Sequence, residues 1–255
     1  MTENSRRKFI GNAAMAGVAA CFLSVNDLRA AHADERAKKL KAGAVILFQG
    51  DSITDGNRGR SEDPNHIMGH GYAFTIASRV GADYPEKSYR FYNRGISANK
   101  VTDLEKRWQT DTLDLKPDIL SILVGVNDSN SVVFNRQPSV SVEQYREVYE
   151  ALLEKTRAIF PEIMLVLGEP FVLKVGRMNE KWEASYSDML KRQAIVRKLA
   201  EKYNAVFVGF QEVFDKACEK VPCDYWIWDG VHPTVPGHEL MAREWMKQVG
   251  KRISF

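Results

Sequence analysis

The sequence predicts one α/β domain in which a parallel β-sheet carries helices on both faces. From residue 41 onward, short apolar runs typical of buried strands alternate with longer segments whose apolar residues recur every three or four positions. Strands that alternate with helices indicate βαβ units, and such units build a parallel sheet. The 255 residues contain no internal repeat and no Pro/Gly/Ser-rich linker in their middle. We therefore expect one domain over residues 41–255, with residues 34–40 as a short solvated lead-in.

Five apolar runs are candidates for the strands of this sheet. They span residues 44–48, 89–92, 119–124, 163–167 and 205–208. The clearest helix spans residues 142–160, with Ser141 as its N-cap and Pro161 directly after its end. Two further helices are expected over residues 184–203 and 237–249.

The composition is that of a soluble globular chain. Hydrophobic residues make up 44% and charged residues 27%, which excludes a disordered chain or one that crosses a membrane several times. The formal net charge of +3 gives no electrostatic case for a nucleic-acid partner. Three cysteines among 255 residues exclude a disulfide-framework protein.

Residues 1–33 resemble an export signal of the twin-arginine type. Arg6-Arg7-Lys8 precedes Phe9 and a mildly apolar stretch over residues 11–25, which is too short and too rich in Gly and Ala for a membrane span. Ala31-His32-Ala33 has the small-x-small pattern of a cleavage site. We expect an exported bacterial protein of the periplasm or cell envelope. The alternative is a lipid anchor on Cys21, because residues 18–21 resemble a lipoprotein cleavage box.

The other two cysteines, Cys218 and Cys223, are five positions apart around a Val-Pro pair. An exported protein can form a disulfide, but so short a loop often misses the required geometry. Two free thiols are therefore the favoured prediction.

Polar residues follow the first three predicted strands, and one further group lies in a late loop. In a parallel sheet the carboxyl ends of the strands meet at one edge, where ligands bind. Acyl transfer by a serine needs a hydroxyl, a base, a group that orients the base, and donors for the oxyanion. Ser52 supplies the hydroxyl, His232 the base and Asp229 the orienting carboxylate, while the Asn127 amide and the Gly95 N–H are candidate oxyanion donors.

These residues carry a resemblance to the SGNH, or GDSL, hydrolase superfamily, which extends over almost the whole of the predicted domain. The four matching blocks are Gly50-Asp51-Ser52-Ile53, Gly95, Gly125-Val126-Asn127-Asp128 and Asp229-Gly230-Val231-His232. The resemblance implies a flavodoxin-like three-layer α/β/α sandwich with a five-stranded parallel sheet. It also implies a Ser52–His232–Asp229 triad, an oxyanion hole of the Ser52 N–H, the Gly95 N–H and Asn127, and no metal or cofactor.

Within the superfamily the chain is most similar to acetylxylan-esterase-like enzymes, which remove acetyl groups from carbohydrates. The resemblance rests on four longer segments, which are residues 50–55, 93–97, 125–128 and 228–233. It implies a serine esterase that hydrolyses O-acetyl groups on a small-molecule or glycan ester through an acyl-enzyme. The alternatives are a lysophospholipase or thioesterase acting on longer acyl chains, and a non-catalytic carbohydrate-binding protein.

Several neighbouring residues have competing interpretations. Asp51 and Ser52 are also typical helix caps, and Asp128 is expected to be structural. Asp55 and Arg58 are expected to brace the loop after Ser52. Two other groups are weaker candidates for a site. A zinc site at His66 and His70 lacks a third ligand, and Ile53 breaks a calcium-loop pattern that starts at Asp51.

Three aromatic residues flank Asp229 in the sequence, namely Tyr225, Trp226 and Trp228. They could stack on a sugar ring, but the favoured prediction is that they cover the core.

Overall fold

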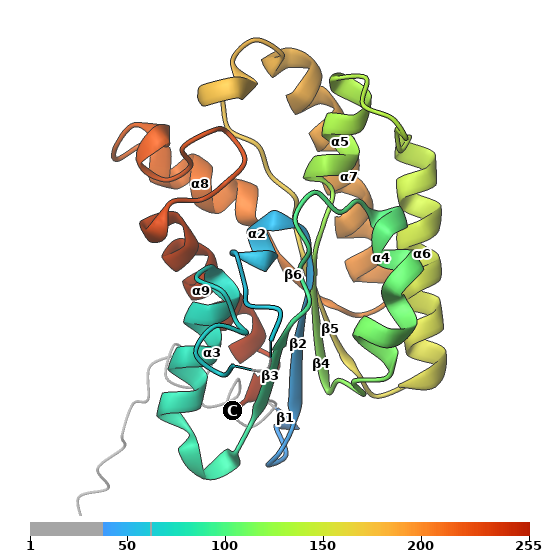
Figure 1. The fold of residues 1–255 in the computed structure, drawn as a ribbon, viewed down its shortest axis with the longest axis vertical. Coiled ribbons are helices and arrows are strands. Elements are labelled where there is room, and N and C mark those ends of the chain that lie inside the picture. The colour runs from blue at the N-terminus through green and yellow to red at the C-terminus, as the bar shows by residue number, and fades with distance from the viewer. Residues whose placement is uncertain (1–37, 62) are drawn as a thin grey trace, which may run out of the picture. The chain divides into compact units, whose positions relative to one another are not determined.

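The main body of the chain is built on a five-stranded parallel β-sheet, shown in Figure 1. The computed structural model describes residues 38–61 and 63–255, so the predicted export signal and Cys21 lie outside the described residues. The strands are β2 (Val45–Gly50), β3 (Arg90–Asn93), β4 (Ile119–Leu123), β5 (Met164–Gly168) and β6 (Val206–Val208). Each predicted strand is present, with ends that differ by one or two residues.

The order of the strands across the sheet is β3-β2-β4-β5-β6. The first main strand therefore lies inside the sheet, where Ile46 of β2 is opposite both Phe91 of β3 and Ile119 of β4. This order is the flavodoxin-like one, and it confirms the predicted fold. The direction of winding reverses between β2 and β4, and in open parallel sheets this is the position at which ligands bind.

Helices cover both faces of the sheet, and the alternation of side chains along the strands explains why. Ile46 and Phe48 belong to one buried cluster and Leu47 to the other, so β2 is apolar on both faces. The first cluster is covered by α3 (Tyr72–Asp83), α8 (Phe210–Cys218) and α9 (Val235–Gly250). The second is covered by α4 (Val101–Trp108), α6 (Val142–Ile159) and α7 (Trp182–Lys202), on the opposite side in Figure 1.

Shorter elements connect this framework. Two short helices follow β2 and β4 directly, namely α2 (Ser52–Asp55) and α5 (Val126–Val133). A π-helical turn, Gln109–Leu113, extends α4, and 3₁₀ turns lie at Pro85–Lys87, Gly176–Met178 and Cys223–Tyr225. A separate two-stranded sheet pairs β1 (Lys38–Lys39) with β7 (Ile253–Ser254) in parallel. Strands of two residues have no sequence pattern, so this pairing within the predicted lead-in was not anticipated.

The helix α6 shows how local sequence and packing agree. The Ser141 side chain accepts a hydrogen bond from the Gln144 N–H at 3.0 Å, which caps the helix as predicted. Tyr145 and Tyr149 recur at a four-residue spacing and are fully buried against the sheet. The helix ends at Ile159, two residues before Pro161, which cannot donate a helical hydrogen bond.

Two buried tryptophans connect the layers through their indole N–H groups. Trp245 of α9 donates to Ser121 Oγ of β4 at 3.0 Å, and Trp108 of α4 donates to Thr156 Oγ1 of α6 at 3.0 Å. Each buried donor is thereby satisfied, which avoids the cost of about 1–3 kcal/mol of leaving it unpaired.

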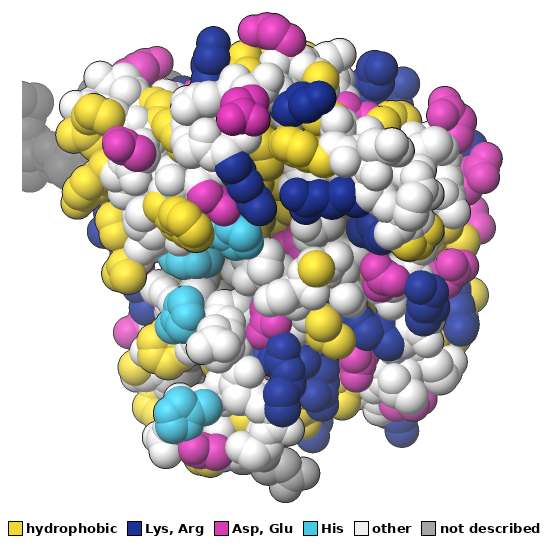
Figure 2. Space-filling view, turned by 45° about the horizontal axis from the view of Figure 1, so that its top comes forward, with side chains coloured by type: hydrophobic (Ala, Val, Ile, Leu, Met, Phe, Trp, Pro, Cys, Tyr) yellow, Lys and Arg dark blue, Asp and Glu magenta, His cyan; other side chains and the backbone are white. Residues whose placement is uncertain are grey.

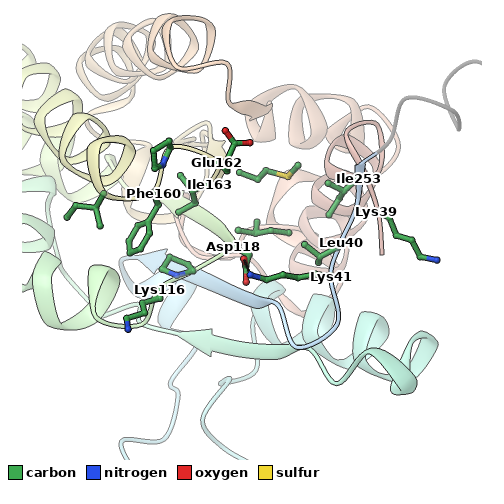
Figure 3. Close-up of a pocket in the computed structure, with 14 residues that line it drawn as sticks. Lys39, Leu40, Lys41, Lys116, Asp118, Phe160, Glu162, Ile163 and Ile253 are labelled. Atoms are coloured by element: carbon green, nitrogen blue, oxygen red, sulfur yellow. Dashed lines mark ion pairs between the residues drawn. The ribbon is translucent and has the colours of Figure 1, made fainter.

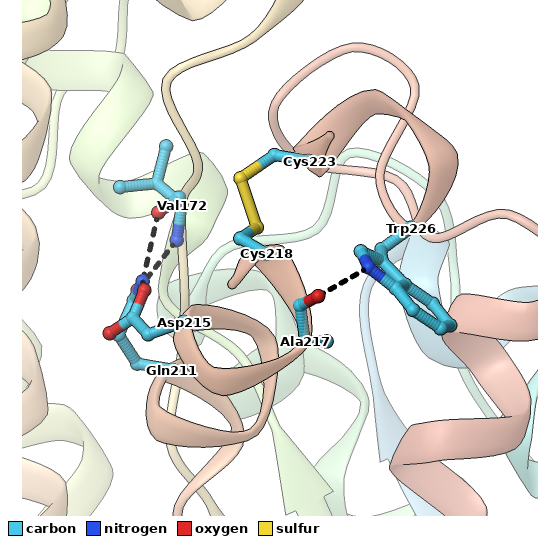
Figure 4. Close-up of a disulfide and its surroundings, with 7 residues drawn as sticks. All are labelled: Val172, Gln211, Asp215, Ala217, Cys218, Cys223 and Trp226. Carbon is cyan, nitrogen blue, oxygen red and sulfur yellow. Dashed lines mark hydrogen bonds between the residues drawn. A yellow bond between two sulfur atoms is a disulfide. The ribbon is translucent and has the colours of Figure 1, made fainter. Parts of the chain in front are cut away.

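Cys218 and Cys223 form a disulfide in the structure (Figure 4), so the prediction of two free thiols was wrong. The last turn of α8 and the following 3₁₀ turn place the two Cα atoms 4.8 Å apart, within the usual range for a disulfide. The same connection is held by Trp226, whose indole N–H donates to the Ala217 carbonyl at 3.0 Å. None of the helices among the described residues is long and apolar enough to cross a membrane.

Candidate active site

Ser52 is placed by the sharp turn from β2 into α2, at the upper end of the strands in Figure 1. Asp51 is the N-cap of α2, and its Oδ1 accepts the Ile53 N–H at 3.0 Å. Capping by Asp51 leaves the Ser52 hydroxyl free for another partner. Gly50 allows the turn to pack closely, because a Cβ there would lie 2.3 Å from the Leu123 carbonyl oxygen of β4.

The structure brings the three predicted triad residues together. Ser52 Oγ lies 2.8 Å from His232 Nε2, although 180 residues separate them in the sequence. On the other side of the imidazole ring, Nδ1 lies 2.9 Å from Asp229 Oδ2. The carboxylate, imidazole and hydroxyl form one hydrogen-bonded chain at the carboxyl end of the sheet. Asp229 is buried, whereas the His232 side chain is 31% exposed and accessible to a ligand.

The Asp229 carboxylate is held in its ionised form by its own loop. Burial would raise the pKa of Asp229, but it accepts hydrogen bonds from the His232 ring and from the backbone N–H groups of His232 and Val231, and these lower the pKa to about 2. Arg177 adds an ion pair at 3.3 Å to the same carboxyl oxygen that faces the ring. Asp229 therefore carries a full negative charge next to His232 at any pH above about 3.

A segment between β5 and α7 supports this loop, and sequence reasoning missed it. The Leu173 N–H donates to the Gly230 carbonyl at 3.0 Å. Gly176 lies against the same loop with φ of +53°, and a Cβ there would be 2.7 Å from the Asp229 Cα. Gly176 and Arg177 are more than fifty residues from Asp229 in a stretch without a recognisable motif, so no sequence signal marked them.

The first predicted oxyanion loop packs against α2, and the second contacts the segment that follows the first. A Cβ on Gly95 would lie 2.3 Å from the Asp55 backbone nitrogen, so only glycine allows this approach. The Gly95 N–H donates to Asn93 Oδ1 at 2.9 Å. The Asn127 side-chain amide donates one hydrogen bond to the Asn99 carbonyl at 3.2 Å, which leaves its second N–H for another acceptor.

Asn93, quoted in the sequence only as part of a segment, is a further bracing residue. Its buried amide donates to the carbonyls of Thr54 at 2.7 Å and Met68 at 2.9 Å, which ties the end of β3 to α2 and to the following loop. The predicted bracing by Asp55 and Arg58 is confirmed. Asp55 accepts the Arg58 N–H at 3.1 Å, and Arg58 Nε donates to the Gly95 carbonyl at 2.9 Å.

Asp128 has the predicted structural position. Its Oδ1 accepts the Val101 N–H at the start of α4 at 3.0 Å, and its side chain is fully buried. Burial raises the pKa of Asp128 to about 6 and that of Asp51 to about 7, because hydrogen bonds to single backbone N–H groups do not offset desolvation. The pKa values of these two carboxyl groups therefore lie well above that of Asp229.

The aromatic residues beside the triad do not share one role. Trp226 packs on the core, as predicted, but Trp228 and Tyr225 are 64% and 55% exposed, so the core-covering interpretation is wrong for these two. The Trp228 ring stacks on the His232 ring with 6.3 Å between centroids. An exposed indole thus borders the site. Figure 2 shows histidine and hydrophobic side chains close together on one face of the molecule.

No group of three or more His, Cys, Asp or Glu is placed to hold a metal ion within residues 38–61 and 63–255. His66, one of the two histidines considered for zinc, instead lies 2.6 Å from an Asp63 carboxylate oxygen.

A cavity of about 570 Å³ lies away from the triad (Figure 3). Its lining includes Ile119 and Met164, which begin β4 and β5, so it lies at the amino ends of the strands. Lys41 and Asp118 form an ion pair at 2.7 Å within it. Because Ser52 follows the carboxyl end of β2, this cavity does not contain the candidate active site.

A sheet of this order, with a Ser–His–Asp chain where its strands end, is typical of serine hydrolases of the GDSL type. The chain belongs to the GDSL-like lipase/acylhydrolase family, since the family model matches residues 48–240. It is therefore a carboxylic ester hydrolase, and a non-catalytic binding role is set aside.

Individual relatives agree with this assignment. The chain is 32% identical to an acetylxylan esterase of Geobacillus stearothermophilus over 222 residues, which are 83% of this chain and 96% of that enzyme. The solved structure of that esterase, Axe2, superposes with a TM-score of 0.74 and covers 85% of this chain. A GDSL-like lipase family protein from Parabacteroides merdae has a TM-score of 0.79 at 40% identity, over 85% of this chain and all of that one. An uncharacterized lipoprotein of Bacillus subtilis, YqeF, is 29% identical over 58% of this chain and 72% of its own length.

The buried imidazole of His238 makes the stability of this region depend on pH. His238 Nδ1 accepts the Tyr72 N–H at 3.1 Å, so the ring must be neutral. Burial, with smaller contributions from His70 and His232, lowers the pKa of His238 to about 4. The unfolded chain binds this proton near pH 6.5, so the folded state loses stability as the pH falls from about 6.5 to 4.

We expect the wild-type free energy of unfolding to fall by about 2–3 kcal/mol more than that of His238→Gln over this pH range. Urea denaturation at several pH values measures the difference. His66→Gln, which alters a side chain that is 72% exposed, is the matched control and should follow the wild type. Parallel curves for the wild type and His238→Gln would contradict the proposed protonation state.

Proposed function

We propose that the protein is a serine esterase in which Ser52 is the nucleophile and His232 is the general base. Asp229 orients the imidazole of His232 and stabilises its protonated form. The observation that carries the proposal is the hydrogen-bonded chain from Ser52 Oγ through both ring nitrogens of His232 to Asp229. Ser52 Oγ attacks the ester carbonyl carbon while His232 Nε2 takes the hydroxyl proton. His232 then returns this proton to the leaving alcohol, and an acyl-enzyme remains. A water molecule, deprotonated by His232, releases the acid and restores Ser52.

The oxyanion formed at the carbonyl oxygen is stabilised by three donors in this proposal. Ser52 is the first residue of α2, where a backbone N–H has no helical carbonyl to donate to. The second amide proton of Asn127 is the next donor. The third is the Gly95 N–H, which already donates to Asn93 Oδ1 and must therefore be shared between that oxygen and the oxyanion.

The proposed substrate is an acetyl ester on a carbohydrate. The acetylxylan esterase of Geobacillus stearothermophilus, 32% identical over most of its length, supports the acyl group and the sugar. The loop after α2 supports a small acyl site, because Met68, one of its few apolar residues, is buried in the core. The exposed Trp228 beside His232 offers an aromatic face on which a sugar ring can stack.

Export of the protein to the periplasm or cell envelope is part of the proposal. Its basis is the twin-arginine pattern at Arg6-Arg7 with the cleavage pattern that ends at Ala33. The alternative is a membrane-anchored protein with a lipid on Cys21. The similarity of the chain to a lipoprotein of Bacillus subtilis supports this alternative. Either form would place the enzyme where extracellular glycans arrive.

Ser52→Ala tests the nucleophile. Removing the attacking oxygen should lower kcat on an acetyl ester by about 10³-fold or more while the fold is retained. In the wild type, rapid quenching should trap an acetyl group on the peptide that contains Ser52, as detected by mass spectrometry. Ser187→Ala, an exposed serine on α7, is the matched control and should keep wild-type kinetics. Substantial turnover by a folded Ser52→Ala variant would eliminate the mechanism.

Asn127→Ala tests the oxyanion hole. A donor that binds the oxyanion more strongly than the ester carbonyl contributes to kcat, so kcat should fall by about 10²–10³ with little change in KM. Asn65→Ala, in an exposed loop, controls for loss of an amide. An increase in KM with unchanged kcat would place Asn127 in substrate binding instead.

A series of 4-nitrophenyl esters from acetyl to octanoyl tests the acyl site. We expect kcat/KM to be highest for acetyl and to fall steeply from butyryl upward, because the largely polar segments after Ser52, Gly95 and Asn127 supply no contiguous apolar run to gain the roughly 0.8 kcal/mol of each buried methylene. Replacing the 4-nitrophenol by a sugar should raise kcat/KM. A preference for octanoyl or longer esters would favour the lysophospholipase or thioesterase alternative, without affecting the proposed triad.

A further inference from the structure

Four arginines gather beside the proposed oxyanion loop, and we call them the arginine cluster. Arg58 and Arg60 follow α2, Arg94 follows β3, and Arg107 lies on α4. Arg107 Nη1 donates to the Arg94 carbonyl at 2.7 Å, and Arg94 and Arg60 both act electrostatically on Arg58. Residues from two separate loops and a helix thus place like charges together on the end of the molecule that carries Ser52.

Two aspartates compensate only half of this charge. Asp55 forms an ion pair with Arg60 at 2.7 Å, and Asp111 forms one with Arg107 at 3.1 Å. Neither Arg58 nor Arg94 has an ion pair within the described part of the chain. Four positive and two negative groups leave a local charge of +2, although the chain without residues 1–33 carries only 32 − 31 = +1 in total.

The unpaired guanidinium groups are partly buried, which makes their charge costly without a ligand. Burial lowers the pKa of Arg58 to about 10, and repulsion from Arg60 and Arg94 adds to this effect. Arg94 Nε is buried without a hydrogen-bond partner among the described residues, and the guanidinium lies 5.8 Å from the Tyr92 ring centroid. An anion bound at the Nη ends of the two guanidinium groups would compensate their charge.

The cluster is connected to the reacting centre through Gly95. Arg94 directly precedes Gly95, and Arg58 Nε donates to the Gly95 carbonyl at 2.9 Å. In the proposed mechanism the ester carbonyl of the substrate lies between Ser52 and the Gly95 N–H. If the sugar chain then continues along the loop after β3, it passes the arginine cluster. Figure 2 shows basic side chains on the same face as the histidines.

We propose that the glycan ester hydrolysed at this site is acidic, and that a carboxylate on a sugar residue near the acetylated one binds to Arg94 and Arg58. The inference rests on the proposed function and specifies its substrate class as an O-acetylated uronic-acid glycan. A guanidinium presents two parallel N–H donors that match a carboxylate, and this geometry gives both affinity and orientation. A neutral glycan would leave the two charges uncompensated and desolvated.

The test compares two substrates that differ only in charge. One is an O-acetylated oligouronide, and the other is the same oligosaccharide after reduction of its carboxyl groups to primary alcohols. Acetate release measures kcat/KM for both. We expect the acidic substrate to be preferred by the wild type by about tenfold or more at low salt, and the preference to shrink at 0.5 M salt, roughly as screening of exposed charges requires.

Arg94→Gln should reduce the acidic-to-neutral ratio of kcat/KM to near one, mainly through KM for the acidic substrate. Arg94→Lys, which keeps the charge but not the paired donors, should retain part of the preference. Arg146→Gln on α6 removes the same charge from a side chain that is paired with Glu147 and Glu150, and should keep the wild-type ratio.

The outcomes separate the two proposals. Hydrolysis of both substrates at equal kcat/KM by the wild type would overturn the acidic-glycan inference and leave the acetylesterase proposal intact. A preference that survives in folded Arg94→Gln and in 0.5 M salt would also overturn it. Failure to release acetate from any acetyl ester would instead overturn the proposed function, and the inference with it.

Discussion

The close approach of the Gly95 backbone to α2 is the constraint on which the site depends. The Asp55 nitrogen and Thr54 carbonyl carbon occupy the space that a side chain at position 95 would need. Because this side chain is absent, Asn93 can reach across and bind the carbonyls of Thr54 and Met68. The loops after β2 and β3 are thereby held in one arrangement.

The second requirement is electrostatic, and it depends on how many donors each carboxylate receives. Asp229 accepts two backbone N–H groups and the His232 ring and remains ionised, with a pKa of about 2. Asp51 is more deeply buried and accepts a hydrogen bond from the Ile53 N–H, and burial raises its pKa to about 7. One carboxylate can therefore stabilise a charged imidazole, whereas the other serves to cap a helix. The difference follows from local burial and hydrogen bonding rather than from residue type.

The strand order explains why these groups meet. Ser52 and Asn127 follow β2 and β4, the neighbouring strands between which the winding reverses. In open parallel sheets ligands bind at this position, beyond the carboxyl ends of the strands. His232 reaches Ser52 from the loop before α9, which is closed by pairing of Ile227 with Pro233 and supported by the segment around Gly176.

Local sequence patterns were enough to predict the fold class, the five strands and the candidate residues of the active site. Strand and helix periodicities depend on neighbours within a few positions, and each of the motifs around Ser52, Gly95, Asn127 and Asp229 is local. The N-cap at Ser141 was predictable for the same reason, since a cap involves residues only three apart.

The contacts between segments that are distant in the sequence could not be predicted from local patterns. The disulfide of Cys218 with Cys223 depends on the geometry of a helix end, and the pairing of β1 with β7 joins residues more than two hundred positions apart. The exposure of Trp228 and the support from Gly176 and Arg177 are likewise properties of loops packed against one another. The sequence around a charged residue or a glycine does not indicate which distant residue it contacts. The structure was therefore needed to show that Asp55 and Asp111 pair with Arg60 and Arg107 and leave Arg58 and Arg94 without an ion pair in the described part of the chain.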